Sequence, residues 1–188
     1  LATRRRVLGP EHRDVEETLV ELGRLYRDQG AGQRAEPLLR EALAIRRKIL
    51  GEEAHETATS MNELALLLWH KGDLSGAEEL FRRCLAINRK TVGEDHPDFS
   101  TSLNNLAALY ARQQRHAEAE PLLAKLLEIQ RRVSGETHPM TLLCMSNLAG
   151  VYRNLGRLDQ AEALQRRTLE ARREVLGAEH PDTLLSMY

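Results

Sequence analysis

The sequence contains little of what marks a secreted, disulfide-linked protein. Its 188 residues include only two cysteines, Cys84 and Cys144, and these occupy non-equivalent positions of the repeats described below. Two such cysteines are typical of free thiols in a reducing compartment rather than of a disulfide framework. We therefore expect a cytoplasmic protein.

A strong net charge and long hydrophobic runs are also missing. The chain carries 27 basic and 28 acidic side chains, which give a formal net charge of -1. Nucleic-acid-binding domains usually show a marked basic excess, so we expect no nucleic-acid partner. No apolar run approaches the roughly 20 residues that a membrane-spanning helix needs, and no signal segment opens the chain, so we expect no membrane association.

Motifs of catalytic chemistry are absent as well. The sequence has no glycine-rich phosphate loop and no nucleophile paired with a general base. Its recurrent histidines are separated by whole repeats, so they cannot form a compact metal site with one another; they are His12, His96, His138 and His180. We predict that the protein is not an enzyme and uses no cofactor or metal, and that Cys84 is a core residue.

What the sequence does contain is one repeat that recurs without a gap. Glycine appears every 42 residues, at Gly9, Gly51, Gly93, Gly135 and Gly177. A fixed period of this size indicates a solenoid, in which each repeat buries its apolar face against its neighbours. We predict a single array over 1–188: the end of a preceding repeat at 1–8, repeats at 9–50, 51–92, 93–134 and 135–176, and the start of a further repeat at 177–188. Residues 1–8 align with 43–50, so we expect the sequence to begin inside the second helix of a repeat.

Each repeat predicts two amphipathic helices. In the third repeat, apolar residues recur at helical spacing over 98–113 and again over 117–133. Glycines that follow the helices are expected in the left-handed conformation, and Gln114 is the exception after a first helix. Two capping boxes are predicted at the start of second helices, formed by Ser75 with Glu78 and by Asp159 with Glu162.

Three columns of residues indicate how the two helices meet. Small residues open the second helix, and leucine and tyrosine recur in the first. The columns are Ala35, Ala77, Ala119 and Ala161; Leu22, Leu64, Leu106 and Leu148; and Tyr26, Leu68, Tyr110 and Tyr152. A leucine, a small residue and a tyrosine, then a glycine turn and an alanine, together resemble the tetratricopeptide repeat.

The repeat is longer than the usual tetratricopeptide unit of about 34 residues. In this respect it is similar to the kinesin light chain subclass, whose repeats carry an L-G-x-x-H-P-D loop and an L-N-N-L-A-x-L-Y helix. The matching segments here are 92–98 and 103–110. The pattern is broken at Ala54-His55, where His-Pro is missing, and at Val20-Glu21, where Asn-Asn is missing.

The resemblance implies an all-α fold: a right-handed tetratricopeptide superhelix, or α-α solenoid, of antiparallel helix pairs. It further implies that the first helices line a concave groove that binds peptides. Carried over to this sequence, the groove residues are Arg24, Arg27, Asn62, Trp69, Asn104, Asn105, Ala108, Arg112, Ser146, Asn147 and Arg153.

The groove residues predict a ligand chemistry. Asparagine offers donors and an acceptor, so Asn62, Asn104, Asn105 and Asn147 could bond a peptide backbone, although each could instead bond a neighbouring repeat. Trp69 is either an apolar anchor or a packing residue. Arg112 and Arg153 favour an acidic ligand residue, whereas Glu17, Glu21, Asp28 and Glu63 are expected to neutralise the first two repeats.

We interpret the chain as a non-catalytic protein-interaction module, an adaptor or scaffold that holds a peptide or partner segment with acidic and apolar residues. The alternative is a regulatory or self-assembly segment of a larger multidomain signalling protein such as an ATPase. Terminal repeats normally need a neighbour to cover their apolar residues, so self-association through the exposed ends is a further expectation.

Overall fold

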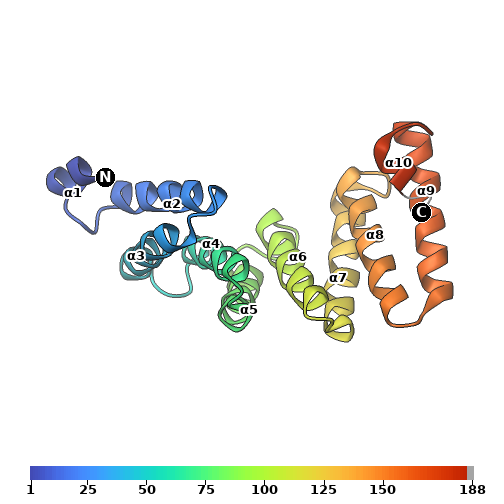
Figure 1. Ribbon diagram of the computed structural model, residues 1–188, viewed down its shortest axis with the longest axis horizontal. Helices are drawn as coiled ribbons and strands as arrows, with labels where there is room; N and C mark the ends of the chain where they lie inside the picture. The colour runs from blue at the N-terminus through green and yellow to red at the C-terminus, as the bar shows by residue number, and fades with distance from the viewer. Residues whose placement is uncertain (186–188) are drawn as a thin grey trace. The chain divides into compact units, whose positions relative to one another are not determined.

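The structure is a computed structural model that describes residues 1–185, apart from the side chains of Asp182 and Leu185. The described chain is helical, with short connections between antiparallel neighbours (Figure 1). The helices are α1 (Ala2–Leu8), α2 (Arg13–Asp28), α3 (Gly32–Leu50), α4 (His55–Lys71), α5 (Leu74–Thr91), α6 (Pro97–Arg112), α7 (His116–Ser134), α8 (Pro139–Asn154), α9 (Leu158–Leu176) and α10 (Pro181–Leu185). The part of the predicted last repeat beyond residue 185 lies outside the described residues.

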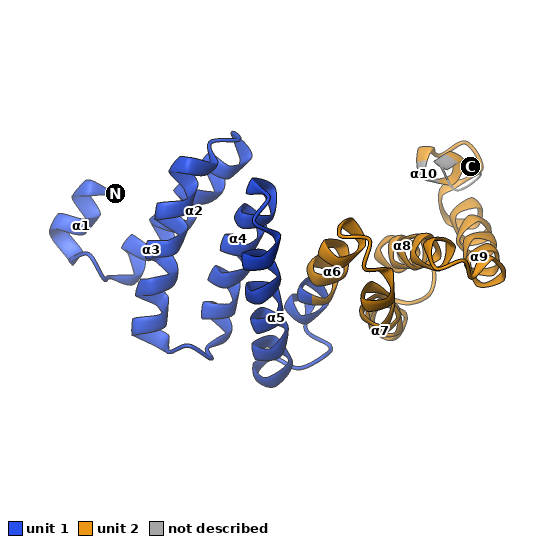
Figure 2. Ribbon diagram, turned by 60° about the horizontal axis from the view of Figure 1, so that its bottom comes forward, with its two compact units in different colours: residues 1–102 blue, residues 103–188 orange. Residues whose placement is uncertain are grey.

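The chain divides into two compact units, unit 1 at residues 1–102 and unit 2 at 103–188 (Figure 2). In unit 1, α3 packs against both α2 and α4, and α4 packs in turn against α5. In unit 2, α8 packs against both α7 and α9, and α10 packs against α9. Within each unit, the helices α3, α4 and α8 are thus covered by the helices before and after them in the chain, which is how a repeat shares its apolar face with its neighbours.

The alanine column is part of the core in both units. Ala35, Ala77 and Ala119 are fully buried, with no exposed surface. A methyl group at this position leaves room for the two helices of a repeat to approach closely, whereas a longer side chain would have to displace a neighbour. Ala161 in α9 is partly exposed, so the column is less tightly covered at the end of unit 2.

Helix starts in the structure are capped differently from the prediction. The backbone N–H groups of Asp14, Asp98 and Met140 each donate to Nδ1 of the histidine two residues earlier, at 3.2 Å. The loop histidines therefore cap the first helix of their repeats, a role that their spacing alone did not reveal. Both predicted capping boxes are wrong, because each helix begins earlier. Asp73 caps α5 by accepting from the N–H of Gly76, and α9 begins after Arg157 without a side-chain cap.

Glycine conformations follow two patterns. Gly72 ends α4 in the predicted left-handed conformation, with φ 87° and ψ 3°. Gly51, Gly135 and Gly177 instead combine φ 90° with ψ between 161° and 167°. Glycine is nearly the only residue that adopts this second combination of angles. At these three glycines the predicted positive φ is confirmed, but the predicted left-handed helical conformation is wrong because ψ is extended. Gln114 has φ 62°, so it adopts the positive φ that glycine has at matched positions.

Ion pairs join the second helix of one repeat to the next repeat. Glu52 binds both Arg47, at 2.7 Å, and Arg83. The matched group in unit 2 is Glu136, which binds Arg131 at 2.8 Å and Arg167 at 2.9 Å. Where the first repeat has Pro10 in place of the loop glutamate, Arg5 binds Glu41 directly at 2.6 Å. The same contact between repeats is therefore made in two chemical ways.

None of the helices in the described part of the chain is both long enough and apolar enough to cross a lipid bilayer.

Candidate functional site

The α6/α8 groove is a cavity of about 350 Å³ in unit 2. Helices α6 and α8 supply nearly all of its wall, and the residues there are three asparagines, small residues, one serine and the two larger apolar residues Leu123 and Val151. The lining residues are Asn104, Ala107, Ala108, Ala111, Leu123, Ser146, Asn147, Gly150, Val151 and Asn154. Four residues predicted from the sequence, Asn104, Ala108, Ser146 and Asn147, are thus brought together in one groove.

Two features of this groove are unusual for a packed helix pair. The Ser146 hydroxyl is buried and has no hydrogen-bond partner among the described residues. Gly150 lies inside α8, yet a Cβ atom built there would meet no atom within 4 Å. A glycine in a helix interior costs roughly 1 kcal/mol relative to alanine, and neither helix packing nor its backbone conformation requires it here. The groove therefore has an open floor at backbone level.

The matched surface in unit 1 is lined mainly by charged and hydroxyl side chains. A cavity of about 240 Å³ lies there between α2 and α4, and its walls include Glu17, Glu21, Arg24 and Glu63. Glu63 accepts from Arg24 and from Arg27, each at 2.7 Å, and its side chain is only 10% exposed. Glu63 therefore neutralises Arg24 and Arg27 within the chain, as one of the sequence interpretations predicted.

The other predicted groove residues lie outside the two cavities. Asn62 in α4 and Asn105 in α6 are partly buried, whereas Arg112 and Arg153 are exposed in the last turns of α6 and α8. The Trp69 indole packs edge-on against Phe81, with 6.2 Å between ring centroids, and its buried Nε1 has no hydrogen-bond partner among the described residues. Of the two interpretations of Trp69, an apolar anchor for a ligand or a packing residue, the contact with Phe81 corresponds to the packing residue.

Sequence reasoning missed a buried ion pair in unit 1. The Glu16 side chain is 2% exposed and accepts from Arg46 at 2.6 Å. Burial raises the pKa of the Glu16 carboxyl, while the hydrogen bond from Arg46 lowers it in part. The sequence did contain a signal for this pair. Glu16 is charged, whereas the equivalent residues of two other repeats, Ala58 and Leu142, are apolar.

Neither cysteine has the environment of a nucleophile. Both are free and buried, and the Cys84 Sγ–H donates to the carbonyl oxygen of Ala58 at 3.1 Å. Burial raises the pKa of Cys84 to about 12 and that of Cys144 to about 11. The thiolate form needed for nucleophilic attack is therefore disfavoured at both sites, and the prediction that Cys84 belongs to the core is confirmed.

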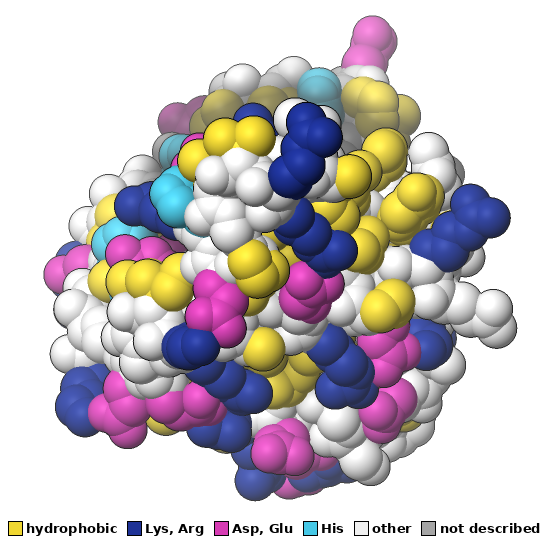
Figure 3. Space-filling model, turned by 90° about the vertical axis from the view of Figure 1, so that its left-hand side faces the viewer, with side chains coloured by type: hydrophobic (Ala, Val, Ile, Leu, Met, Phe, Trp, Pro, Cys, Tyr) yellow, Lys and Arg dark blue, Asp and Glu magenta, His cyan; other side chains and the backbone are white. Residues whose placement is uncertain are grey.

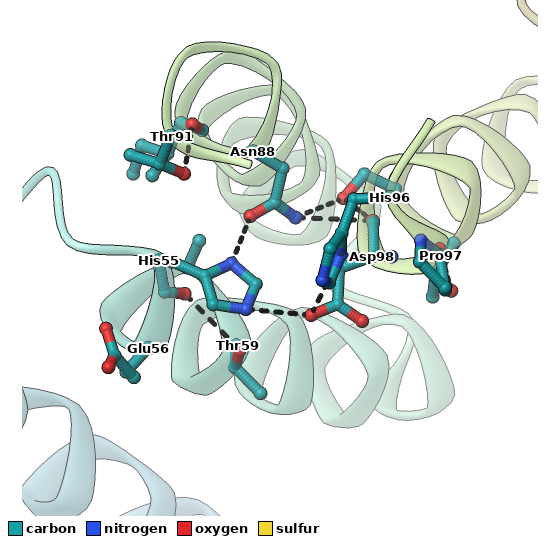
Figure 4. A network of polar contacts seen from close by, with 12 residues as sticks. His55, Glu56, Thr59, Asn88, Thr91, His96, Pro97 and Asp98 are labelled. Carbon is teal, nitrogen blue, oxygen red and sulfur yellow. Dashed lines mark hydrogen bonds and ion pairs between the residues drawn. The ribbon is translucent and has the colours of Figure 1, made fainter. Parts of the chain in front are cut away.

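Two histidines of unit 1 meet in a polar cluster (Figure 4). The His55 ring faces the Asn88 Oδ1 atom at 3.1 Å and the Asp98 Oδ2 atom at 2.9 Å, and it stacks edge-on against His96. The Asn88 amide in turn donates to Ser102 Oγ at 2.9 Å. No group of three metal-ligating side chains with suitable geometry occurs among the described residues. The cluster joins α4, α5 and the start of α6, and its geometry is that of a structural contact.

On the face drawn in Figure 3, surface charge does not mark a site. In Figure 3, basic and acidic side chains are interspersed over the face shown, so neither sign forms a continuous field there. This matches the nearly balanced charge of the sequence.

Comparison with known proteins defines the class of the fold. The tetratricopeptide repeat family profile matches residues 14–90, 56–110, 98–174 and 142–188. These segments cover most of the sequence, and the chain belongs to the tetratricopeptide repeat family. The predicted all-α solenoid of helix pairs is thereby confirmed. No curated protein is detectably similar to this chain in sequence.

Solved structures narrow the likeness to a subclass. The nearly identical TPR-like repeats of a Podosopora anserina protein assigned as a kinesin light chain superpose with a TM-score of 0.84 at 31% identity, covering 93% of this chain and 83% of that one. A variant form of the same repeats gives a TM-score of 0.83, with 90% and 80% covered, also at 31% identity. BtubC (BKLC) from P. vanneervenii shares the fold at 24% identity, with a TM-score of 0.78 over 92% of this chain and 69% of that one. The predicted resemblance to kinesin light chain-like repeats is confirmed.

Proposed function

We propose that this protein is a non-catalytic protein-interaction module that binds an extended peptide segment in the α6/α8 groove. The observation that carries the proposal is the open, amide-lined floor of this groove, with Gly150 at its base. Tetratricopeptide repeats generally form interaction modules, and the chain belongs to that family. We further propose an adaptor or scaffold role in the cytoplasm, where its two free thiols would remain reduced.

The groove chemistry suits a peptide backbone. Asn104 and Asn147 each offer two N–H donors and a carbonyl acceptor, and Ser146 offers a hydroxyl that lacks a partner in the described structure. A backbone presents the complementary N–H and C=O groups at regular intervals, whatever its side chains. The small residues Ala108 and Gly150 let such a backbone approach the helices closely.

Residues outside the groove would set the preference among peptides. Arg112 and Arg153 are exposed near the C-terminal ends of α6 and α8, where a guanidinium group can bind a carboxylate bidentately. Leu123 and Val151 line the groove itself and can contact an apolar side chain of the ligand, whereas Trp69 in unit 1 is partly buried and would offer a separate apolar contact to a partner. We therefore propose a partner segment that contains both an acidic and an apolar residue.

The test is titration of a peptide library against the full chain and two variants. Asn104→Ala removes backbone contacts and should weaken every bound peptide. Arg112→Ala should weaken mainly acidic peptides and reduce the salt dependence of their binding. We expect wild-type affinity in the micromolar range, about -8 kcal/mol.

Two results would contradict the proposal. If both variants bind every peptide as the wild type does, the α6/α8 groove is not the binding site. If no peptide binds and the chain only associates with itself in analytical ultracentrifugation, the self-assembly interpretation replaces the peptide-binding one.

A further inference from the structure

A larger cavity lies on a different face of α8. It has a volume of about 800 Å³ and is bounded by α7, α8 and α9. Its apolar surface comes from Leu127, Leu148, Tyr152 and Leu164, and exposed Ala124 and Ala163 stand at its rim. We call this the α7/α9 cavity. Because it shares no lining residue with the α6/α8 groove, it can be tested independently of the proposed function.

The rim of this cavity differs from the matched positions in unit 1. Ala124 and Ala163 correspond to Arg40 and Glu79, which lie 84 residues earlier in the sequence. Arg40 is held by Glu36 at 2.8 Å, and Glu79 lies beside Arg83 on α5. The chain therefore places long charged side chains at these positions in unit 1 and methyl groups in unit 2. Two truncated rim residues leave the apolar surface of the α7/α9 cavity accessible.

Charge at the cavity favours an acidic ligand. Three arginines line it, Arg131, Arg132 and Arg167, against the single lining glutamate Glu128. Glu136 binds Arg131 and Arg167 at one edge and holds their guanidinium groups in place. A guanidinium group has five N–H donors, so an arginine that binds Glu136 still has donors for a ligand carboxylate. Preorganised guanidinium groups beside an apolar surface match a ligand that has carboxylates beside apolar side chains.

The dimensions favour a helix as the occupant. The α7 lining residues run from Ala124 to Arg132, which spans about 12 Å at the helical rise of 1.5 Å per residue, or slightly more than two turns. An amphipathic helix of this length presents apolar residues at i, i+3, i+4 and i+7 to a groove. We infer that the α7/α9 cavity is a second docking site, which binds an acidic amphipathic helix of a partner protein.

The probe is a set of 14-residue peptides with leucine, phenylalanine or tryptophan along one helical face and glutamate on the other. The full chain, labelled at its methyl groups, is titrated with each peptide and followed by NMR, with fluorescence anisotropy for affinity. At least one peptide should bind with a micromolar dissociation constant and shift the signals of Leu127, Leu148 and Leu164. The same peptides with lysine in place of glutamate should bind at least tenfold more weakly.

The matched variant carries the unit 1 residues at the rim, Ala124→Arg together with Ala163→Glu. Both positions are exposed on helices, so the melting temperature should stay close to that of the wild type, while peptide binding should weaken at least tenfold. Asn104→Ala, in the α6/α8 groove, should leave the peptide-induced shifts of the Leu127, Leu148 and Leu164 signals unchanged, because Asn104 does not line the α7/α9 cavity. The proposal is wrong if no glutamate peptide shifts the three leucine signals, if the rim variant binds as the wild type does, or if the lysine peptides bind equally well.

Discussion

The two units use matched positions of the same repeat for opposite purposes. Residues 84 apart in the sequence occupy equivalent places on the first helices, and the pairs are Arg24 with Ala108, Arg27 with Ala111 and Glu63 with Asn147. In unit 1 these residues form ion pairs at 2.7 Å. In unit 2 their counterparts line an open groove of about 350 Å³. The leucine and alanine columns that pack the helices are the same in both units, so three side chains decide whether this surface carries paired charges or neutral, small side chains.

The largest effect is expected from breaking the ion pairs of unit 1. Glu63→Ala removes the acceptor of two arginines, and the side chains of Glu63 and Arg27 are only 10% and 17% exposed. Arg24 loses this partner and Arg27 keeps only Asp28, so the free energy of unfolding should fall by about 2 kcal/mol. Asn147→Ala, the matched change in unit 2, should cost no more than about 0.5 kcal/mol. Urea unfolding followed by circular dichroism measures both, and equal losses would contradict the comparison.

Moving the ion-pair residues of unit 1 into unit 2 should close the groove. The triple variant Ala108→Arg, Ala111→Arg and Asn147→Glu places long charged side chains where a peptide would lie. We expect the binding of peptides selected on the wild type to weaken by about thirtyfold, or about 2 kcal/mol. Isothermal titration provides the measurement, and circular dichroism confirms that the variant is folded. Undiminished binding by a folded variant would place the peptide elsewhere.

Each unit has a glycine inside a first helix, and the two should respond oppositely to alanine. Gly150→Ala adds a methyl group in open space, so it should raise the free energy of unfolding by about 0.5 to 1 kcal/mol. The same methyl should weaken peptide binding by about 1 kcal/mol, or fivefold. Gly23→Ala would bring Cβ within 2.6 Å of the Leu39 Cδ2 atom and should destabilise unit 1 by about 1 to 3 kcal/mol. Thermal melts and titrations distinguish the pair, and a destabilised Gly150→Ala would show that the groove floor is packed.

The smallest effect is expected at the turn after a first helix. Gln114 in unit 2 has φ 62°, whereas Gly30 at the matched position of unit 1 has φ 72°. Gln114→Gly relieves the steric cost of a positive φ, which is about 1 kcal/mol, but adds freedom to the unfolded chain, so we expect a net gain of about 0.5 kcal/mol. Gly30→Gln should have the opposite sign. Differential scanning calorimetry can resolve both shifts, and a loss of stability in Gln114→Gly would mean that the side chain contributes more than its strain costs.

The sequence was sufficient to predict the elements of the fold, because helical periodicity and a glycine period are local signals. Residues 98–113, for instance, were expected as a helix, and α6 spans Pro97–Arg112. Contacts between charged side chains were less accessible. Glu63 lies 39 residues from Arg24 in the sequence, and their pairing depends on how two helices align side by side, which no periodicity reports. The histidine caps were missed for a similar reason, since each depends on loop geometry and on which ring nitrogen faces the helix.

The candidate site shows the same limit. Asn104, Ala108, Ser146 and Asn147 could be placed on one surface because the repeat register carries them there. The binding of Arg24 and Arg27 by Glu63 could be given only as one of two alternatives. Arginines have the same spacing in the sequence whether their side chains contact solvent, a ligand or a neighbouring helix. The repeat register also carries Gly150 to this surface, but the sequence did not predict that the missing side chain would leave the floor of the groove open.

The two chemical forms of the contact between repeats determine which pieces of this protein could be exchanged during its evolution. Glu52 and Arg83 belong to one repeat and together present a carboxylate to Arg47 of the repeat before it. Pro10 and Glu41 do the same for Arg5. If two repeats recombined between the loop and the second helix, one product would have Pro10 in the loop and an arginine in place of Glu41, so two arginines would face each other without a carboxylate. The other product would have Glu52 in the loop and Glu41 in the helix, so two carboxylates would lie close together. Whole repeats that begin at the glycine can be duplicated or shuffled without this conflict, because each 42-residue segment carries both groups that present the carboxylate.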